Sequence, residues 1–198
     1  IGWIRMLNLV LGTSTHAFEL MLSAFILGLA FGGFWIRKRI DKMSNPMLSL
    51  GYIQIIMGVM ALLTLLFYSN TFNLMQWIME VTNKDAQGYL IFNLSSNGIA
   101  LLIMFPVTFC AGMTLPIITT ILFGLRGERS IGLVYGWNTI GAIIGVLFAV
   151  HLGLPILGLK GLISFGAGID IVLGIILLFA YSHKSSKFGL KILIGSIG

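Results

Sequence analysis

Four polar residues stand out because each interrupts a stretch that is otherwise almost wholly apolar: Arg5, Glu19, Asn138 and Asp170. An ionisable group inside a bilayer costs about 2.5–3.5 kcal/mol on insertion scales, so such groups usually face the protein interior or a water-filled cavity. A carboxylate in that setting can bind a cationic substrate or carry a proton. We therefore expect these four residues to belong to a substrate or ion pathway, with Glu19 and Asp170 lining it.

Glu19 has two polar neighbours on its own helical face, because His16 and Ser23 lie three and four residues away. Arg5 lies on the preceding stretch, across a four-residue turn. At a rise of 1.5 Å per residue, Glu19 is about one helical turn below the outer surface and Arg5 about two. Long side chains can bridge that offset, so we expect an Arg5–Glu19 ion pair, either within the pathway or as a purely structural pair.

Asp170 lies near the middle of an apolar stretch, and Gly166 and Gly174 share its helical face at intervals of four residues. A carboxylate flanked by glycines either packs against another backbone or lines a cavity. Its own helix carries no basic residue, which favours a functional role. Asn138 can hydrogen-bond Asp170 or a backbone carbonyl. We favour an interhelical contact for this residue over a contact with a ligand.

The composition is that of an integral membrane protein. The chain is 58% hydrophobic and 9% charged, with a mean hydropathy of +1.02, whereas soluble domains carry about 25% charged residues. The net charge of +6 comes mainly from basic residues that flank apolar stretches, so it does not indicate a nucleic-acid partner. One cysteine, Cys110, excludes an internal disulfide, and we predict no metal site and no cofactor. The sequence has no P-loop, nucleophile elbow or HExxH pattern, so this segment does not look like an enzyme by itself.

We predict an all-α, polytopic membrane bundle of about six to seven transmembrane helices. The predicted helices are Ile1–Leu11, His16–Ile36, Met47–Tyr68, Tyr89–Phe123, Ile131–Leu152 and Gly161–Tyr181, with a further span starting near Phe188. The predicted connections are Gly12–Thr15, Arg37–Pro46, Ser69–Gly88, Gly124–Ser130, Gly153–Lys160 and Ser182–Lys191.

Two of these segments have particular features. Pro106 and Pro116 should bend the stretch Tyr89–Phe123, which is too long for one straight crossing. The connection Ser69–Gly88 has a rough apolar face, which predicts a short helix lying in the membrane interface.

Basic residues gather in alternate connections, at 37–46, 124–130 and 182–191. The positive-inside rule places these connections on the cytoplasmic side, and Ser69–Gly88 outside. We expect the plasma membrane of a bacterium or archaeon. Both ends of the chain are apolar, so we expect residues 1–198 to be a single transmembrane domain and a fragment truncated within spans.

Small residues predict where helices approach closely, since membrane helices associate through close packing. Gly28 and Gly32 form one GxxxG pair, extended by Ala17 and Ala24. The stretch Ile131–Leu152 has small residues on two faces, which predicts a central helix with neighbours on both sides. These faces contain Gly132 and Gly136, and Asn138, Gly141, Ala142, Gly145 and Ala149. A single GxxxG is weak evidence, because membrane helices are generally rich in glycine.

Several segments together resemble the membrane module of the spermidine synthase-like family, in which a polyamine aminopropyltransferase is fused to a major-facilitator-like transmembrane domain. The similarity covers nearly the whole chain. Its most specific parts are Trp3–Arg5, Gly28–Gly32, Gly112–Pro116 and Asn138–Gly145.

The resemblance implies a major-facilitator-like half and a soluble synthase domain elsewhere in the parent chain. That domain would use decarboxylated S-adenosylmethionine to extend a polyamine. None of its motifs occurs here, so no catalytic residue carries over. The resemblance also implies a cationic partner such as a polyamine, besides the lipid bilayer. Three functions stay open: a module that anchors or serves polyamine synthesis or transport, half of a major-facilitator-type secondary transporter, and a scaffold that translocates nothing.

Overall fold

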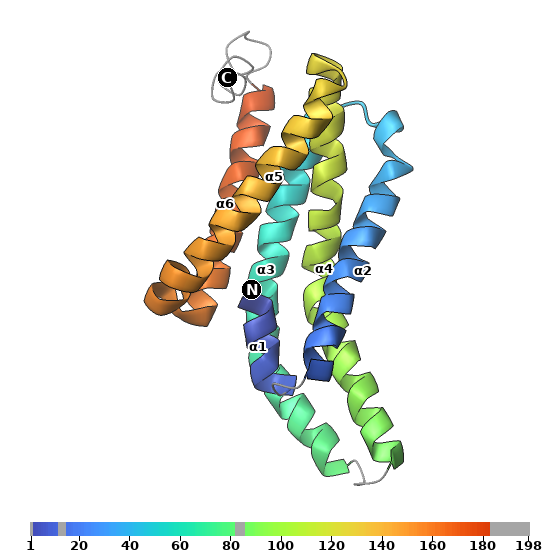
Figure 1. Cartoon of the computed structure of the whole chain (residues 1–198), viewed down its shortest axis with the longest axis vertical. Helices are drawn as coiled ribbons and strands as arrows, with labels where there is room; N and C mark the ends of the chain where they lie inside the picture. Colours follow the sequence, from blue (N-terminus) through green and yellow to red (C-terminus); the bar gives the residue numbers. More distant parts are fainter. Residues whose placement is uncertain (1, 12–14, 82–85, 183–198) are drawn as a thin grey trace.

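The computed structural model describes residues 2–11, 15–81 and 86–182, and this part of the chain is helical apart from short turns and contains no strand (Figure 1). The all-α class is therefore confirmed. The helices are α1 (Gly2–Leu11), α2 (Thr15–Arg37), α3 (Pro46–Val81), α4 (Ala86–Arg126), α5 (Arg129–Phe148) and α6 (Leu154–Ser182), with a short 3₁₀ helix η1 (Ile40–Lys42) and a π-helix η2 (Ala149–Gly153).

Four helical stretches of the described chain are long and apolar enough to cross a membrane. They are Phe18–Arg37, Pro46–Tyr68, Gly98–Arg126 and Arg129–Tyr181. The last is 53 residues long, and it reverses direction between α5 and α6 (Figure 1). The described part of the chain is thus a membrane-type helical bundle with four such stretches, whereas the whole sequence predicts six to seven spans. The span predicted near Phe188 lies outside the described residues.

The connection predicted at Ser69–Gly88 is wrong over most of its length. The helix α3 continues unbroken to Val81, and α4 already begins at Ala86. No glycine or proline occurs between Ser69 and Val81, so nothing in that run ends the helix. The separate interfacial helix expected there is instead the end of α3. In Figure 1 the lower ends of α3 and α4 reach beyond α1 and α2.

The long fourth helix agrees with the sequence. The single helix α4 has 41 residues and contains both Pro106 and Pro116, and it changes direction along its length (Figure 1). It ends at a tight turn in which Gly127 has a φ of 66°. This turn lies at the same end of the bundle as the connection between α2 and α3 (Figure 1). The basic connections in the described chain therefore share one end, and their cytoplasmic orientation stays a prediction.

The connection predicted at Gly153–Lys160 is mostly helical. The chain passes from α5 through η2 into α6, and the break comes at Gly158, with φ 67° and ψ −177°. An L-residue with a side chain rarely adopts that conformation, so glycine is what allows the reversal.

The core centres on α4, which contacts α1, α2, α3 and α5. One buried cluster joins the first four helices to α6, and a second lies nearer the end where α2 stops. The first contains Met6, Leu7, Met21, Ala24, Tyr68, Ile99, Ala100, Ile103, Met104 and Ile163, and the second contains Ile36, Leu50, Ile53, Cys110, Met113 and Ile117.

Candidate functional site

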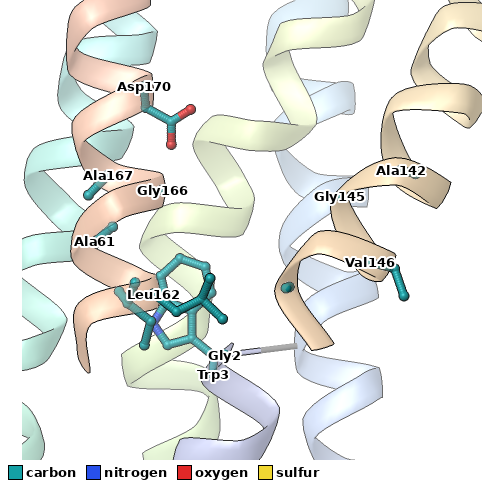
Figure 2. Close-up of a pocket in the computed structure, with 12 residues that line it drawn as sticks. Gly2, Trp3, Ala61, Ala142, Gly145, Val146, Leu162, Gly166, Ala167 and Asp170 are labelled. Carbon is teal, nitrogen blue, oxygen red and sulfur yellow. The ribbon is translucent and has the colours of Figure 1, made fainter. Parts of the chain in front are cut away.

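A cavity of about 380 Å³ lies between α1, α3, α5 and α6. We call it the Asp170 groove. Figure 2 shows α6 and α5 on opposite sides of it, with the start of α1 between them at one end. Its lining residues are mainly small or apolar: Gly2, Trp3, Ala61, Ala142, Gly145, Val146, Ala149, Leu162, Ile163, Gly166, Ala167 and Asp170.

Asp170 is the only ionisable side chain among these lining residues. It lies eleven residues after Leu159 and twelve before Ser182, which places it about 17 Å from either end of the straight part of α6. That distance is about half the thickness of the hydrocarbon core. The carboxyl group points away from α6 into the groove (Figure 2). Of the two alternatives left open by the sequence, packing against backbone or lining a cavity, the structure shows the second.

The position of Asp170 depends on how closely α6 packs against α3. A Cβ atom on Gly58 would lie 2.6 Å from the Ala167 carbonyl oxygen, and one on Gly174 would lie 2.7 Å from the Gly51 carbonyl oxygen. Both distances are shorter than real Cβ contacts allow. The two backbones therefore touch at two levels, one turn on either side of Asp170, so the carboxyl group is carried by a helix with little freedom to shift.

Trp3 closes one end of the groove and is itself held in place. Its indole N–H donates a hydrogen bond to the Thr64 hydroxyl at 3.1 Å. About one turn further along α1, the Tyr68 hydroxyl donates to the Met6 carbonyl oxygen at 3.2 Å. These two bonds attach the first half of α1 to α3 and hold the wall that Trp3 forms.

The opposite wall is α5, and here the sequence prediction fails. A Cβ atom built on any of Gly132, Gly136, Gly141 or Gly145 would meet no other described atom within 4 Å. All four are exposed, as is most of the helix. The prediction that this helix is central is therefore wrong. Small residues permit a close neighbour but do not attract one, and in this fold α5 diverges from α6 and leaves the groove open.

Gly28 and Gly32, in contrast, lie in a tight interface with α4. A Cβ atom on Gly28 would overlap the Thr108 hydroxyl, and one on Gly32 would overlap the Phe109 carbonyl oxygen. Thr108 cannot easily yield, because its hydroxyl donates to the Met104 carbonyl oxygen at 2.9 Å. The α2–α4 packing is thus of the kind that the GxxxG spacing predicts.

Several packing glycines were not singled out as such from the sequence. Gly112 of α4 meets the Leu29 carbonyl in the same interface. Gly51 and Gly58 belong to the α3–α6 contact. The sequence did contain a pattern that marks Gly51 and Gly58, because residues seven apart share a helical face and Ala61 lies on the same face. This pattern was overlooked because it contains no GxxxG pair.

The other three predicted pathway residues do not line the Asp170 groove. Arg5 is exposed on α1 and Glu19 is exposed on α2. Asn138 lines a separate cavity of about 410 Å³ between α4 and α5, beside Arg126. The structure therefore does not bring these four residues together, and the side chain of His16 lies outside those described.

No group of three or more His, Cys, Asp or Glu side chains that could hold a metal ion occurs in residues 2–11, 15–81 and 86–182. The chemistry that the Asp170 groove offers is one carboxyl group among apolar walls, with an indole ring at one end. A scan against protein-family models and searches of curated proteins and solved structures found no match to this chain.

Proposed function

We propose that this integral membrane domain binds a cationic group at Asp170, in the groove between α1, α3, α5 and α6. One observation carries the proposal: a single carboxyl group at the middle of an apolar helix lines a cavity with no basic residue among its lining. A buried or lipid-facing charge is costly unless it has a partner, and a cationic ligand supplies one. The same carboxyl group can also take up a proton.

Polyamines are the class of cation that we place first. They alternate ammonium groups with methylene segments, and the groove offers one acceptor and apolar walls of matching character. The face of the Trp3 ring can add a cation–π contact to a second ammonium group. The resemblance to the membrane module of spermidine synthase-like proteins points to the same class, and in that setting the domain would anchor or serve polyamine synthesis or transport.

A scaffold role is the second candidate, and the backbone contacts between α2 and α4 and between α3 and α6 favour it. Two interfaces that pack glycine against carbonyl groups make a rigid platform, which suits an anchor for a soluble domain. In that case Asp170 would have no ligand.

Spermidine binding to the full chain distinguishes these functions. The protein is reconstituted in phosphatidylcholine vesicles, whose zwitterionic surface does not itself attract polyamines. Asp170→Asn preserves size but removes the charge, and we expect it to lower spermidine affinity by about tenfold or more, the usual loss for a charged hydrogen bond. Glu19→Gln is the matched control, because it removes a carboxylate from a span outside the groove, and it should bind as the wild type does.

Two results would contradict the proposal: no spermidine binding by the wild-type protein, or undiminished binding by Asp170→Asn. Spermidine that accumulates inside the vesicles, in addition to spermidine bound to the protein, would favour a transporter half and not an anchoring module.

A further inference from the structure

A second cavity, of about 520 Å³, lies where α2 ends, between α2, α4 and α5. We call it the Arg37 groove. It is separate from the Asp170 groove and shares no lining residue with it. Its lining residues come from one face of α2, from η1, and from the facing parts of α4 and α5: Leu29, Ala30, Gly33, Phe34, Arg37, Ile40, Pro116, Thr119, Thr120 and Tyr135.

Two of the residues that line this groove, Arg37 and Tyr135, have polar groups that can bind an anion. Arg37 is the last residue of α2, at the point where the apolar span ends, and Tyr135 lies across from it on α5. Both side chains are exposed. Arg37 ends the apolar stretch Phe18–Arg37, and Tyr135 lies near the start of the stretch Arg129–Tyr181; basic and aromatic residues near the ends of spans are the usual neighbours of lipid headgroups.

The rest of the groove presents mainly carbon. Leu29, Ala30 and Phe34 follow one face of α2. The hydroxyls of Thr119 and Thr120 donate to carbonyl oxygens of their own helix, at 2.8 Å and 3.0 Å. These walls therefore suit an acyl chain, while Arg37 and Tyr135 suit an anion.

The surrounding charge favours an anionic headgroup. Arg37, Lys38, Arg39 and Lys42 follow one another within six positions, with Asp41 as the one acidic residue among them. The Arg39 guanidinium carbon lies 4.0 Å from the centroid of the Trp35 ring, and neither Arg39 nor Trp35 lines the groove. Arg37 is thus the cation placed at the groove itself.

We propose that the Arg37 groove binds an anionic phospholipid. The phosphate accepts hydrogen bonds from the Arg37 guanidinium, whose planar fork matches two phosphate oxygens, and from the Tyr135 hydroxyl. One acyl chain lies along Leu29, Ala30 and Phe34. Basic pockets between transmembrane helices bind anionic headgroups in this way. Such a lipid would hold the start of α5 against α2 and α4, at the end where α5 joins the bundle.

Native mass spectrometry of the full chain tests this site. Protein stripped of lipid is titrated with phosphatidylglycerol and, separately, with phosphatidylcholine of the same acyl chains. We expect the wild type to bind the first phosphatidylglycerol at least about fivefold more tightly than phosphatidylcholine, the usual effect of one basic residue at an anionic surface. Arg37→Gln should abolish that preference, and Tyr135→Phe should reduce it.

Lys38→Gln is the matched control. It removes the same unit charge from the next position, which does not line the groove, and it should retain the preference. Arg37→Lys keeps the charge without the fork and should give an intermediate value.

Three results would overturn the proposal. Equal binding of the two lipids would mean that the groove holds an acyl chain only. Equal losses for Arg37→Gln and Lys38→Gln would assign the effect to the whole basic end of the molecule. A protein chain that copurifies with the wild type and is released by Arg37→Gln would make the groove a helix-docking site.

Discussion

The α2–α4 interface and the face of α5 that contains Gly141 and Gly145 have similar sequences but opposite structures. Both have glycines spaced four apart in an apolar helix. Gly28 and Gly32 lie so close to α4 that neither has room for a methyl group, whereas Gly141 and Gly145 have no other described atom within 4 Å of a built Cβ. The difference lies in the partner. α4 offers Gly112 and the backbone around Thr108 and Phe109 to α2, while α6 has diverged from α5. Small residues therefore mark where a helix can be approached, and the topology decides whether it is.

The largest expected effect is at the closed interface. Gly32→Leu would drive a side chain into the Phe109 backbone, which cannot move aside as a flexible side chain would. Overpacking a core typically costs about 1–3 kcal/mol and more when backbone must shift, so we expect loss of the folded state or a large drop in the melting temperature in detergent. Gly141→Leu, the same change at an open position, is the control. A wild-type melting temperature for Gly32→Leu would mean that α2 and α4 are not in contact.

A somewhat smaller effect is expected where α3 meets α6. Gly58→Leu would collide with Ala167 and with the Ile171 side chain, which can give way in part. We expect a loss of about 1–3 kcal/mol in the free energy of unfolding. Because this contact carries Asp170, spermidine binding should fall as well. Retained binding together with reduced stability would show that α6 keeps its place without the glycine contact.

Much of the fold follows from the sequence, and particular residues show where it does not. The apolar runs after Thr15 and Pro46 gave α2 and α3 their starts to within a residue or two, and Pro106 and Pro116 were correctly kept within one long helix. The end of α3 was missed because the change from apolar to mixed composition after Tyr68 looks like a boundary, although the backbone has no reason to stop there.

The candidate site was predicted only in part. The position of Asp170 in a cavity was predicted from the free-energy cost of placing a carboxylate in an apolar span. The residues that line the groove with it include Trp3, Ala61 and Gly145 from three other helices, and no spacing within a helix reports which helices meet. The same argument grouped Glu19 and Asn138 with Asp170, but the arrangement of the helices places both of them outside the Asp170 groove.

The open face of α5 should separate stability from binding. Gly145→Leu places a large side chain into the Asp170 groove, and its Cβ atom meets no other described atom within 4 Å. We expect a change in stability within about 0.5 kcal/mol, as for other surface substitutions, together with a loss of spermidine binding comparable to that of Asp170→Asn. Gly141→Leu, whose position does not line the groove, should preserve both properties.

A large drop in the melting temperature of both the Gly141→Leu and Gly145→Leu variants would contradict this comparison. It would show that α5 has close neighbours on that face, as the small-residue pattern alone predicted.

A loss of stability smaller than at the two glycine interfaces is expected at the α1–α3 contact, which is intermediate between the closed interface and the open face. The Trp3–Thr64 hydrogen bond crosses from one helix to the other, and Thr64 is 6% exposed. Thr64→Val keeps the shape and removes the acceptor, so the indole N–H loses its partner. A net hydrogen bond contributes about 0.5–1.5 kcal/mol, and we expect a destabilisation in that range, measured by the shift in the melting temperature. Thr139→Val is the control, because its hydroxyl bonds only to its own helix, at the Tyr135 carbonyl. If Thr64→Val and Thr139→Val behave alike, then α1 is held by apolar packing around Met6 and Leu7, and the wall of the Asp170 groove that Trp3 forms is not fixed by its hydrogen bond.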